Sequence, residues 1–268
     1  MPQPLKEILD PERAKEYVAG SQIWRAIFRH GYPDNPRNRA MAVISNLFLH
    51  LHPIRIKTHG LRLRYTWCMG GLTFFLFLIE TITGLLLMFY YRPTPEYAHS
   101  DMVYLRADVP VGITREVHRW AAHAMVITVW LHMFRVFLTG SYKPPREFNW
   151  GIGVFLLVFT LLLSFTGYLL PWDQLAIWAI TVGSNMARAT PFLGHEGPGA
   201  SFLQIGDLAL VHAGDDAKFG LLGGRFVGSA ALLRFYVLHC VGLPLLVATL
   251  IAVHFWRVRR DGGISGPG

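Results

Sequence analysis

The sequence predicts an all-α membrane protein: a four-helix transmembrane bundle with amphipathic helices at its surface. The 268-residue chain is 52% hydrophobic, with a mean hydropathy of +0.34. Only 16% of its residues are charged, whereas soluble domains carry about 25%. Long apolar blocks, each sufficient to cross a hydrocarbon layer of about 30 Å, lie near residues 66–91, 116–139, 150–170 and 231–256.

The segment before the first span is predicted to lie outside the bundle. Residues 1–64 form an amino-terminal extension, with a short surface helix expected around Pro11–Arg29. Residues 39–56, RAMAVISNLFLHLHPIRI, have the composition of an amphipathic interfacial helix that Pro53 interrupts. No cleavable leader is expected, because the first 40 residues are polar and charged. Residues 65–268 form the predicted four-helix domain.

The loops predict the orientation of the spans. Lys and Arg number 11 in residues 1–65, two in 140–149 and three in 257–260, against six in 92–115 and 171–230 together. By the positive-inside rule, both termini and the short 140–149 loop face the cytoplasm, and we expect a bacterial cytoplasmic membrane. The net charge of +8 therefore reflects membrane topology and does not indicate nucleic acid as a partner.

The third and fourth spans are separated by about 60 residues, which is too long for a loop without structure or function of its own. A proline, Pro171, ends the third span. A surface helix is expected beyond it, including residues 182–191.

Two predicted spans carry paired histidines. His118 and His132 are 14 residues apart in the second span, HRWAAHAMVITVWLH, and His239 and His254 are 15 apart in the fourth. Fourteen helical steps miss four turns by about 40° and fifteen overshoot by about 60°, so each pair lies near one face, about 21 to 22 Å apart along the axis. The two spans run in the same direction, so their first histidines share one depth and their second histidines another.

Two haems, each held between two imidazoles, would account for this pattern in a four-helix bundle. The alternative is that these histidines are isolated hydrogen-bonding groups or members of a proton relay. Intramembrane polar groups are functional by default, and pairs at matched depth favour haem ligation over that alternative. His123 has no counterpart in the fourth span and is interpreted as a core or interface histidine.

Glycines repeat the histidine spacing in the other two spans. Gly70 and Gly84 are 14 residues apart in the first span, as are Gly153 and Gly167 in the third. A glycine at each haem depth would leave room for a porphyrin edge. The alternative is ordinary small-residue helix packing, which does not predict a spacing that matches the histidines.

Arginines close to these positions would suit the haem propionates. Arg115, Arg119 and Arg135 lie near the histidines of the second span, and cations bind carboxylates through charge-assisted hydrogen bonds. The alternative is that their side chains extend to the membrane interface, which applies most strongly to Arg119.

Four further stretches, together with the histidine pairs, resemble the amino-terminal four-helix part of the cytochrome b/b6 family: GSYKPPREFNW (140–150), TGYLLPWDQ (166–174), RFYVLH (234–239) and HFWRVRRDGGISGPG (254–268). The resemblance covers about residues 65–268 and leaves the extension and an insert near 193–222 unmatched. It implies that His118 and His239 hold an outer, low-potential haem b, and that His132 and His254 hold an inner, high-potential haem b. The 15-residue step from His239 to His254 and the end of the sequence after GISGPG favour the b6 type, in which cytochrome b is split between two subunits.

Cys68 indicates which type within the cytochrome b/b6 family the chain resembles. It lies in YTWCMGG (65–71), where the resemblance implies a third haem, of c type, attached by one thioether bond near the inner quinone site. Arg259 resembles the position that meets the carboxylates of this haem. The alternative is a small residue in a helix interface, and the usual C-x-x-C-H attachment signal is missing. Cys240 is interpreted as a packing residue.

The resemblance implies a di-haem subunit of a quinol-oxidising bc/b6f-type complex, which carries electrons between outer and inner quinone sites and couples this to proton translocation. The enzyme would be a quinol:cytochrome c/plastocyanin-type oxidoreductase, with no complete active site in this chain. Expected partners are a separate carboxy-terminal cytochrome b subunit, a Rieske iron–sulfur protein and a c-type cytochrome, in a dimeric complex. The end of the third span and residues 182–191 would form one wall of the outer quinol site.

The histidine pattern by itself also fits two other functions. A di-haem membrane anchor of a hydrogenase or formate dehydrogenase would lack TGYLLPWDQ and the glycine pairs. A proton channel or transporter that uses histidines as a relay would show no b-type absorption band. No role is predicted for His195 and His212, in the loop between the third and fourth spans, and the quinone species is not predicted.

Overall fold

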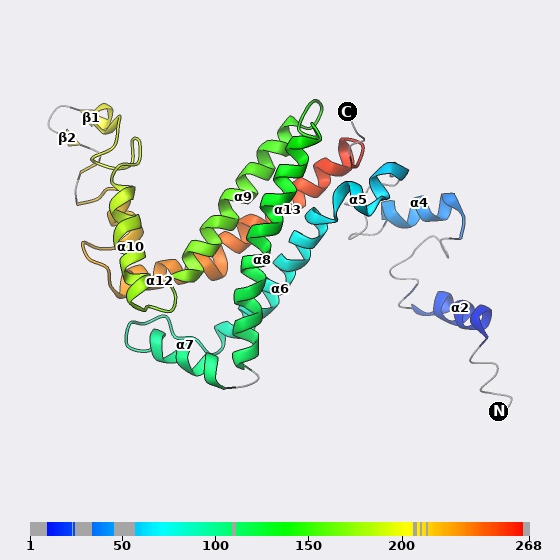
Figure 1. The fold of residues 1–268 in the computed structure, drawn as a ribbon, viewed down its shortest axis with the longest axis horizontal. Helices are drawn as coiled ribbons and strands as arrows, with labels where there is room; N and C mark the ends of the chain where they lie inside the picture. The colour runs from blue at the N-terminus through cyan, green and yellow to red at the C-terminus, as the bar shows by residue number, and fades with distance from the viewer. Residues whose placement is uncertain are drawn as a thin grey trace. The chain divides into compact units, whose positions relative to one another are not determined.

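The computed structural model describes residues 10–22, 24, 34–45, 57–108, 111–205, 208, 209, 211, 212 and 214–264. Figure 1 shows the elements in chain order. They are α2 (Pro11–Gly20), α4 (Pro36–Ser45), η2 (Thr58–Leu61), α5 (Leu63–Thr66), α6 (Met69–Met88), α7 (Ala98–Ala107), α8 (Val111–Leu138), α9 (Glu147–Tyr168), α10 (Gln174–Ala187), η3 (Ala200–Leu203), β1 (Gln204–Ile205), β2 (Leu208–Ala209), α11 (Ala217–Leu222), α12 (Ser229–Val237), η4 (Leu238–Gly242) and α13 (Leu243–Arg260). The two strands form one short antiparallel pair.

Four of these helical segments are long and apolar enough to cross a membrane: Met69–Met88, Gly112–Leu138, Glu147–Tyr168 and Ser229–Arg260. The predicted all-α, four-span fold class is confirmed. The first span begins at residue 69, later than predicted, because Trp67 and Cys68 both adopt a left-handed backbone with φ of 50°. This conformation ends α5 and starts α6, and hydropathy does not report it.

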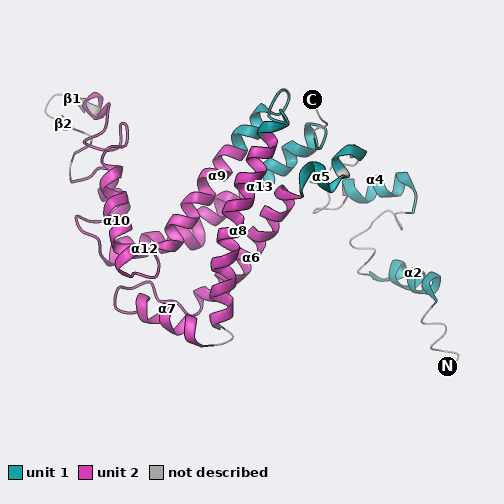
Figure 2. Cartoon of the chain, viewed as in Figure 1, with its two compact units in different colours: residues 1–67, 137–152, 251–268 teal, residues 68–136, 153–250 magenta. Residues whose placement is uncertain are grey.

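The chain divides into two compact units, shown in different colours in Figure 2. Unit 1 comprises residues 1–67, 137–152 and 251–268, and unit 2 comprises residues 68–136 and 153–250. Unit 2 therefore contains all of α6 and most of α8 and α9, together with α12 and η4.

Unit 1 brings together two of the stretches that carry the family resemblance. In the 140–149 loop, Arg146 donates a hydrogen bond from Nη2 to the backbone oxygen of Asp261 at 3.0 Å. Arg257 pairs with the Asp261 carboxylate at 2.9 Å, and its Nη2 lies 3.5 Å from the backbone oxygen of Pro145. The arginines of these stretches therefore tie the end of α13 to the 140–149 loop.

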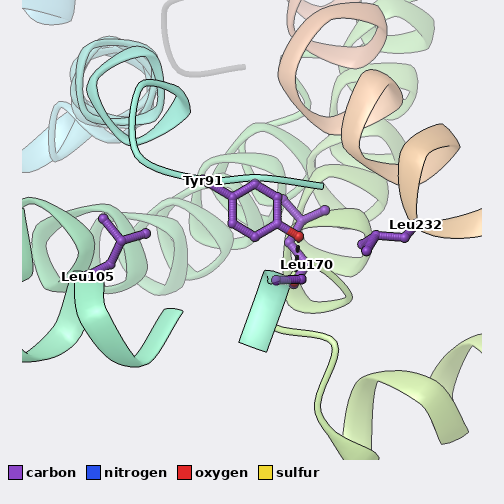
Figure 3. Close-up of a cluster of buried hydrophobic side chains, with 5 residues drawn as sticks. Tyr91, Leu105, Leu170 and Leu232 are labelled. Carbon is purple, nitrogen blue, oxygen red and sulfur yellow. Dashed lines mark hydrogen bonds between the residues drawn. The ribbon is translucent and has the colours of Figure 1, made fainter. Parts of the chain in front are cut away.

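One apolar cluster of unit 2 lies where the first and third spans end (Figure 3). Its buried members are Tyr91, Ala98, Leu105, Leu170 and Leu232. Tyr91 donates a hydrogen bond from its hydroxyl to the Leu170 backbone oxygen at 2.7 Å. This bond satisfies a carbonyl that the end of α9 would otherwise leave without a helical partner.

Helix α7 was not predicted from the sequence, because its ten residues are too mixed in polarity to give a strong pattern. It supplies Asp101, a buried acid that accepts hydrogen bonds from the Arg92 backbone amide at 2.9 Å and from its guanidinium at 2.6 and 3.0 Å. These bonds hold the pKa of Asp101 below its ordinary value against the opposing effect of burial. The loop after α6 is therefore fixed to α7 by a charge pair.

The surface helix predicted beyond Pro171 is present, but it ends before residue 191. α10 starts after Asp173, whose side chain caps it by accepting from the Ala176 amide at 2.8 Å. It ends at Ala187, so residues 188–191 lie beyond the helix. The Pro191 end of that prediction is therefore wrong.

The predicted surface helices of the extension are present in part. α2 begins with Pro11 after an Asp10 cap and ends at Gly20, before the expected end near residue 29. α4 starts at Pro36, before the expected residue 39, and is described as far as Ser45. The rest of both predictions, apart from residues 21, 22 and 24, lies outside the described residues.

Candidate functional site

Two of the predicted iron ligands lie close together within unit 2. The His118 ring, on α8, and the His239 ring, on η4, have their centroids 6.1 Å apart and their planes at 77°. The two rings are therefore close together, with a steep angle between their planes. The geometry of their nitrogens decides whether they could hold a metal.

The Nδ1 atom of His118 is directed at α6. It lies 2.9 Å from Oγ1 of Thr83, whose own hydroxyl is 2.7 Å from the Ile79 backbone oxygen. A hydroxyl has one hydrogen, and a carbonyl oxygen can only accept it. Thr83 therefore accepts from an Nδ1–H of His118, and this arrangement favours the tautomer with a lone pair on Nε2.

His239 has the same arrangement against α9. Its Nδ1 is 3.1 Å from the Leu163 backbone oxygen and 3.2 Å from Oγ1 of Thr166. Thr166 donates its hydroxyl hydrogen to the Leu162 backbone oxygen at 2.9 Å. A backbone oxygen accepts only, so Nδ1 carries the hydrogen here too, and Nε2 again keeps its lone pair.

This geometry fits a metal held between two imidazoles. A metal–imidazole bond is about 2 Å long. With about 1 Å from each nitrogen to its ring centroid, two rings on opposite sides of one ion would have centroids roughly 6 Å apart, and the observed separation is 6.1 Å. Histidine ligands characteristically donate their other N–H to a carbonyl, hydroxyl or carboxylate, as both rings do here.

The predicted glycines lie against the histidine rings. A Cβ on Gly84 would meet Cε1 of His118 at 3.2 Å, and one on Gly167 would meet Cε1 of His239 at 2.6 Å. Gly70 has the same relation to His132, at 3.1 Å. The nearest atoms that these glycines accommodate therefore belong to the imidazoles, and their predicted role beside a porphyrin edge stays a prediction. The fourth glycine, Gly153, is buried.

A π-helical turn explains the unequal histidine spacing. His239 lies in η4 (Leu238–Gly242), a π-helical segment between α12 and α13. A single π-turn absorbs one extra residue in a helix. A 15-residue step that contains it is therefore equivalent to the 14-residue step from His118 to His132.

The second predicted pair is divided between the units. His132 lies on α8 in unit 2, against Gly70. His254 lies on α13 in unit 1, beside the backbone of Asn149. Each ring is thus approached by the span that carries the glycine of its own predicted depth, and the pairing of the two histidines stays a prediction.

The arginines that are predicted to bind the haem propionates lie in different surroundings. Arg115 pairs with Glu116 at 2.8 Å. Arg119 is exposed, lies 3.6 Å from the same carboxylate and stacks 5.3 Å from the Trp120 ring, an arrangement that favours the interfacial alternative for this residue. Arg135 and Arg259 are half-buried.

Cys68 is exposed at the first turn of α6, and Cys240 is half-buried. Exposure makes the Cys68 sulfur accessible to a haem, which is the condition for covalent attachment.

The remaining histidines make local contacts. His123 is exposed, with Nδ1 2.6 Å from the Arg119 backbone oxygen, so it is not a core residue of this chain. Nδ1 of His195 lies 2.5 Å from the carboxylate of Asp216, and the same carboxylate caps the start of α11. Burial alone would raise the pKa of Asp216, but the bonds from His195 and the Phe219 amide keep it below its ordinary value. His212 contacts Asp215.

Sequence reasoning missed three side chains that contact the histidines: Thr83, Thr166 and Glu80. The signal for the two threonines was present in the sequence as the repeated Thr-Gly dipeptide in ETITG (80–84) and LSFTG (163–167), whereas Glu80 has no counterpart in the second segment.

The family model described as cytochrome b/b6/petB matches residues 56–197, which is more than half of the chain. The chain belongs to the cytochrome b/b6 family. It is 42% identical to cytochrome b6 of Heliobacterium mobile over 217 residues, covering 81% of this chain and 90% of that protein. It is 42% identical to cytochrome b6 of Gracilaria tenuistipitata var. liui and 41% identical to that of Chlamydomonas reinhardtii, each match covering 75% of this chain and 84% of the relative.

Among solved structures, a chain of a hyperthermophilic respiratory complex III is similar, with a TM-score of 0.62 and 28% identity over 75% of this chain. This cytochrome b/b6 chain spans about half, 49%, of that chain's length. The protein is therefore a cytochrome b6-type membrane subunit of a bc-type oxidoreductase complex, a family with b haems. This assignment overrules the hydrogenase-anchor and histidine-relay alternatives.

Proposed function

We propose that this chain carries electrons across the membrane between an outer and an inner quinone site, through two b haems, and so couples quinol oxidation to proton translocation. His118 and His239 hold the outer haem, and His132 and His254 the inner one. The observation that carries this proposal is the close pair of His118 and His239, whose centroids are 6.1 Å apart and whose Nδ1 atoms both contact acceptors on neighbouring helices.

The haem supplies the one-electron redox chemistry when it is bound. The chain supplies position and environment. Thr83 and Thr166 fix the orientation and tautomer of the two imidazoles. Gly84 and Gly167 let the helices approach closely enough for each ring to lie between α6 and α8 or between α9 and η4. The apolar spans keep the pair in surroundings of low dielectric constant.

Cys68 is proposed to carry a third haem, of c type, through a thioether bond. Its exposure at the first turn of α6 supports this role, as does its position two residues before Gly70 at the inner haem depth. Arg259 would bind the carboxylates of this haem, and Arg115 and Arg135 those of the b haems, with Arg119 contributing least.

The proposed complex contains a separate carboxy-terminal cytochrome b subunit, a Rieske iron–sulfur protein and a c-type cytochrome, and is dimeric. The 42% identity to a cytochrome b6, of which 90% is covered, supports assembly into a complex of this kind. The end of α9 and α10 would form one wall of the outer quinol site. Both termini would face the cytoplasm of a bacterial cell, as the loop charges predict.

The test is a haem count and a reduced-minus-oxidised spectrum for single alanine variants in the purified complex. His118→Ala and His239→Ala should each lose the same haem, and His132→Ala and His254→Ala should each lose the other. His123→Ala is the control and should keep both. Retention of both b haems after any of the four ligand changes would contradict the pairing, as would loss of different haems within one pair.

A further inference from the structure

The insert between the third and fourth spans, residues 193–222, contains two neighbouring aspartates that each contact a histidine. Asp215 contacts His212, three residues away, so this contact is local. Asp216 contacts His195, which is 21 residues away, with Oδ2 lying 2.5 Å from Nδ1 of the ring. The second pair therefore joins two distant parts of the insert, whereas the first pair does not.

Asp216 lies at the centre of the contacts around the end of α10. Its side chain is 1% exposed, and its Oδ1 accepts a hydrogen bond from the Phe219 amide at 3.1 Å, which caps α11. Its Oδ2 lies 4.0 Å from Nε of Arg188, the residue that follows α10. Although burial opposes ionisation, the bonds from His195 and the Phe219 amide hold the pKa of Asp216 below its ordinary value. One buried, charged carboxylate therefore joins the start of α11 to the residues beyond α10.

Other contacts hold α11 and the chain beyond α10 in the same place. Lys218 on α11 donates a hydrogen bond from Nζ to Oδ1 of Asn185 on α10 at 2.7 Å. A Cβ on Gly194 would overlap the backbone oxygen of Arg188. The chain that leads to His195 therefore lies so close to the end of α10 that only a glycine fits there.

α11 also packs against the elements of the proposed outer quinol site. Its Leu222 is fully buried in a cluster with Ile180 of α10, with Leu169 just beyond α9, and with Phe235 of α12. The end of α9 and α10 are the elements proposed to form one wall of that site. The insert is therefore part of what holds this wall in place.

We propose that Asp216 is a positioning residue for the outer quinol site: through its contact with His195 it fastens the end of α10 to α11 and so fixes the wall that α10 forms. This inference rests on the proposed quinol oxidation. Asp216 acts through α10 and does not touch the quinol. If the quinol binds only the fastened arrangement, weakening the contact raises the quinol concentration needed for half the maximal rate and leaves the reaction of bound quinol unchanged.

The test measures the rate of quinol oxidation by the purified complex against duroquinol concentration, which gives KM and kcat. His195→Ala removes the contact with Asp216 and leaves the cap of α11 intact. It should raise the KM for duroquinol about tenfold, because a hydrogen bond to a charged group contributes at least about this factor, and should leave kcat unchanged. His212→Ala is the matched control, since it removes only the local contact with Asp215, and should change neither. His195→Asn keeps a side-chain N–H that can donate to Asp216 and should restore most of the wild-type KM.

A second variant and a second measurement test the fastening itself. Asp216→Asn keeps an oxygen that can cap α11 and removes the charge, so it should raise KM as His195→Ala does. Both variants should keep both b haems. The protection of the α11 amides from hydrogen exchange should fall in these two variants and should stay unchanged in His212→Ala.

The outcomes separate the positioning role from the proposed function. Lower protection with unchanged KM in both variants would overturn the positioning role, because the contact would then only fold the insert. Unchanged protection and KM would overturn it too, as would an equal rise of KM in His212→Ala or the loss of b haems in both variants. In each of these cases quinol oxidation by the wild-type complex still stands. A wild-type complex that does not oxidise duroquinol would overturn the proposed function and this inference with it.

Discussion

Replacing Gly167 with alanine tests whether this glycine exists to admit the His239 ring. The new Cβ would lie 2.6 Å from Cε1 and 3.1 Å from Nδ1 of His239. Carbon atoms pack best at about 3.5 to 4.0 Å, so the ring has to move by about 1 Å. A move of that size would stretch the Nδ1 contacts with Leu163 and Thr166, now 3.1 and 3.2 Å, beyond hydrogen-bonding distance.

The expected magnitude follows from the cost of overpacking, about 1 to 3 kcal/mol. This corresponds to a loss of about 5- to 150-fold in the affinity for the outer haem. Gly84→Ala should have a smaller effect, because its Cβ would lie 3.2 Å from the His118 ring, so that a shift of a few tenths of an ångström relieves the contact.

The assay is the ratio of each b haem to protein after purification, followed by the temperature at which the outer haem is released. Gly71→Ala is the matched control, since it lies on α6 next to Gly70 and an added Cβ has nothing within 4 Å. Full outer-haem occupancy and unchanged release in Gly167→Ala would refute the reasoning, as would an equal loss in Gly71→Ala.

Three further predictions concern other parts of the chain. Cys68→Ala should abolish haem staining of this polypeptide on a denaturing gel while both b haems remain, and Cys240→Ala should not; an unstained wild-type band would contradict covalent attachment. Tyr91→Phe should lower the free energy of unfolding by about 1 kcal/mol, because it leaves a buried carbonyl unpaired; no change in chemical denaturation would count against this. The hydrogen bonds from Arg92 lower the pKa of Asp101. The contribution of Asp101 to the stability of the fold is therefore complete above about pH 4 and is lost as the pH falls through the lowered pKa. The protection of the α7 amides from hydrogen exchange, measured relative to their intrinsic rates at each pH, should therefore fall only in acid, whereas Asp101→Asn should show the lower protection already at neutral pH.

The sequence alone determined the features that depend on one segment at a time. The spans follow from apolar runs long enough for a membrane, which is a local property. The matched depths of His118 and His239 follow from helical periodicity and from the alternating direction of successive spans. The 14-residue spacing of the glycines could be read the same way, although the rings that they accommodate could not.

Only the tertiary structure decided how the helices use these residues. The left-handed backbone at Trp67 and Cys68 and the π-turn around His239 depend on how neighbouring segments fit together, and composition carries no trace of them. The contacts of Thr83 and Glu80 with His118 join residues 35 and 38 positions apart in the chain. Such contacts depend on which faces of two helices meet, and side-chain packing between helices sets that choice.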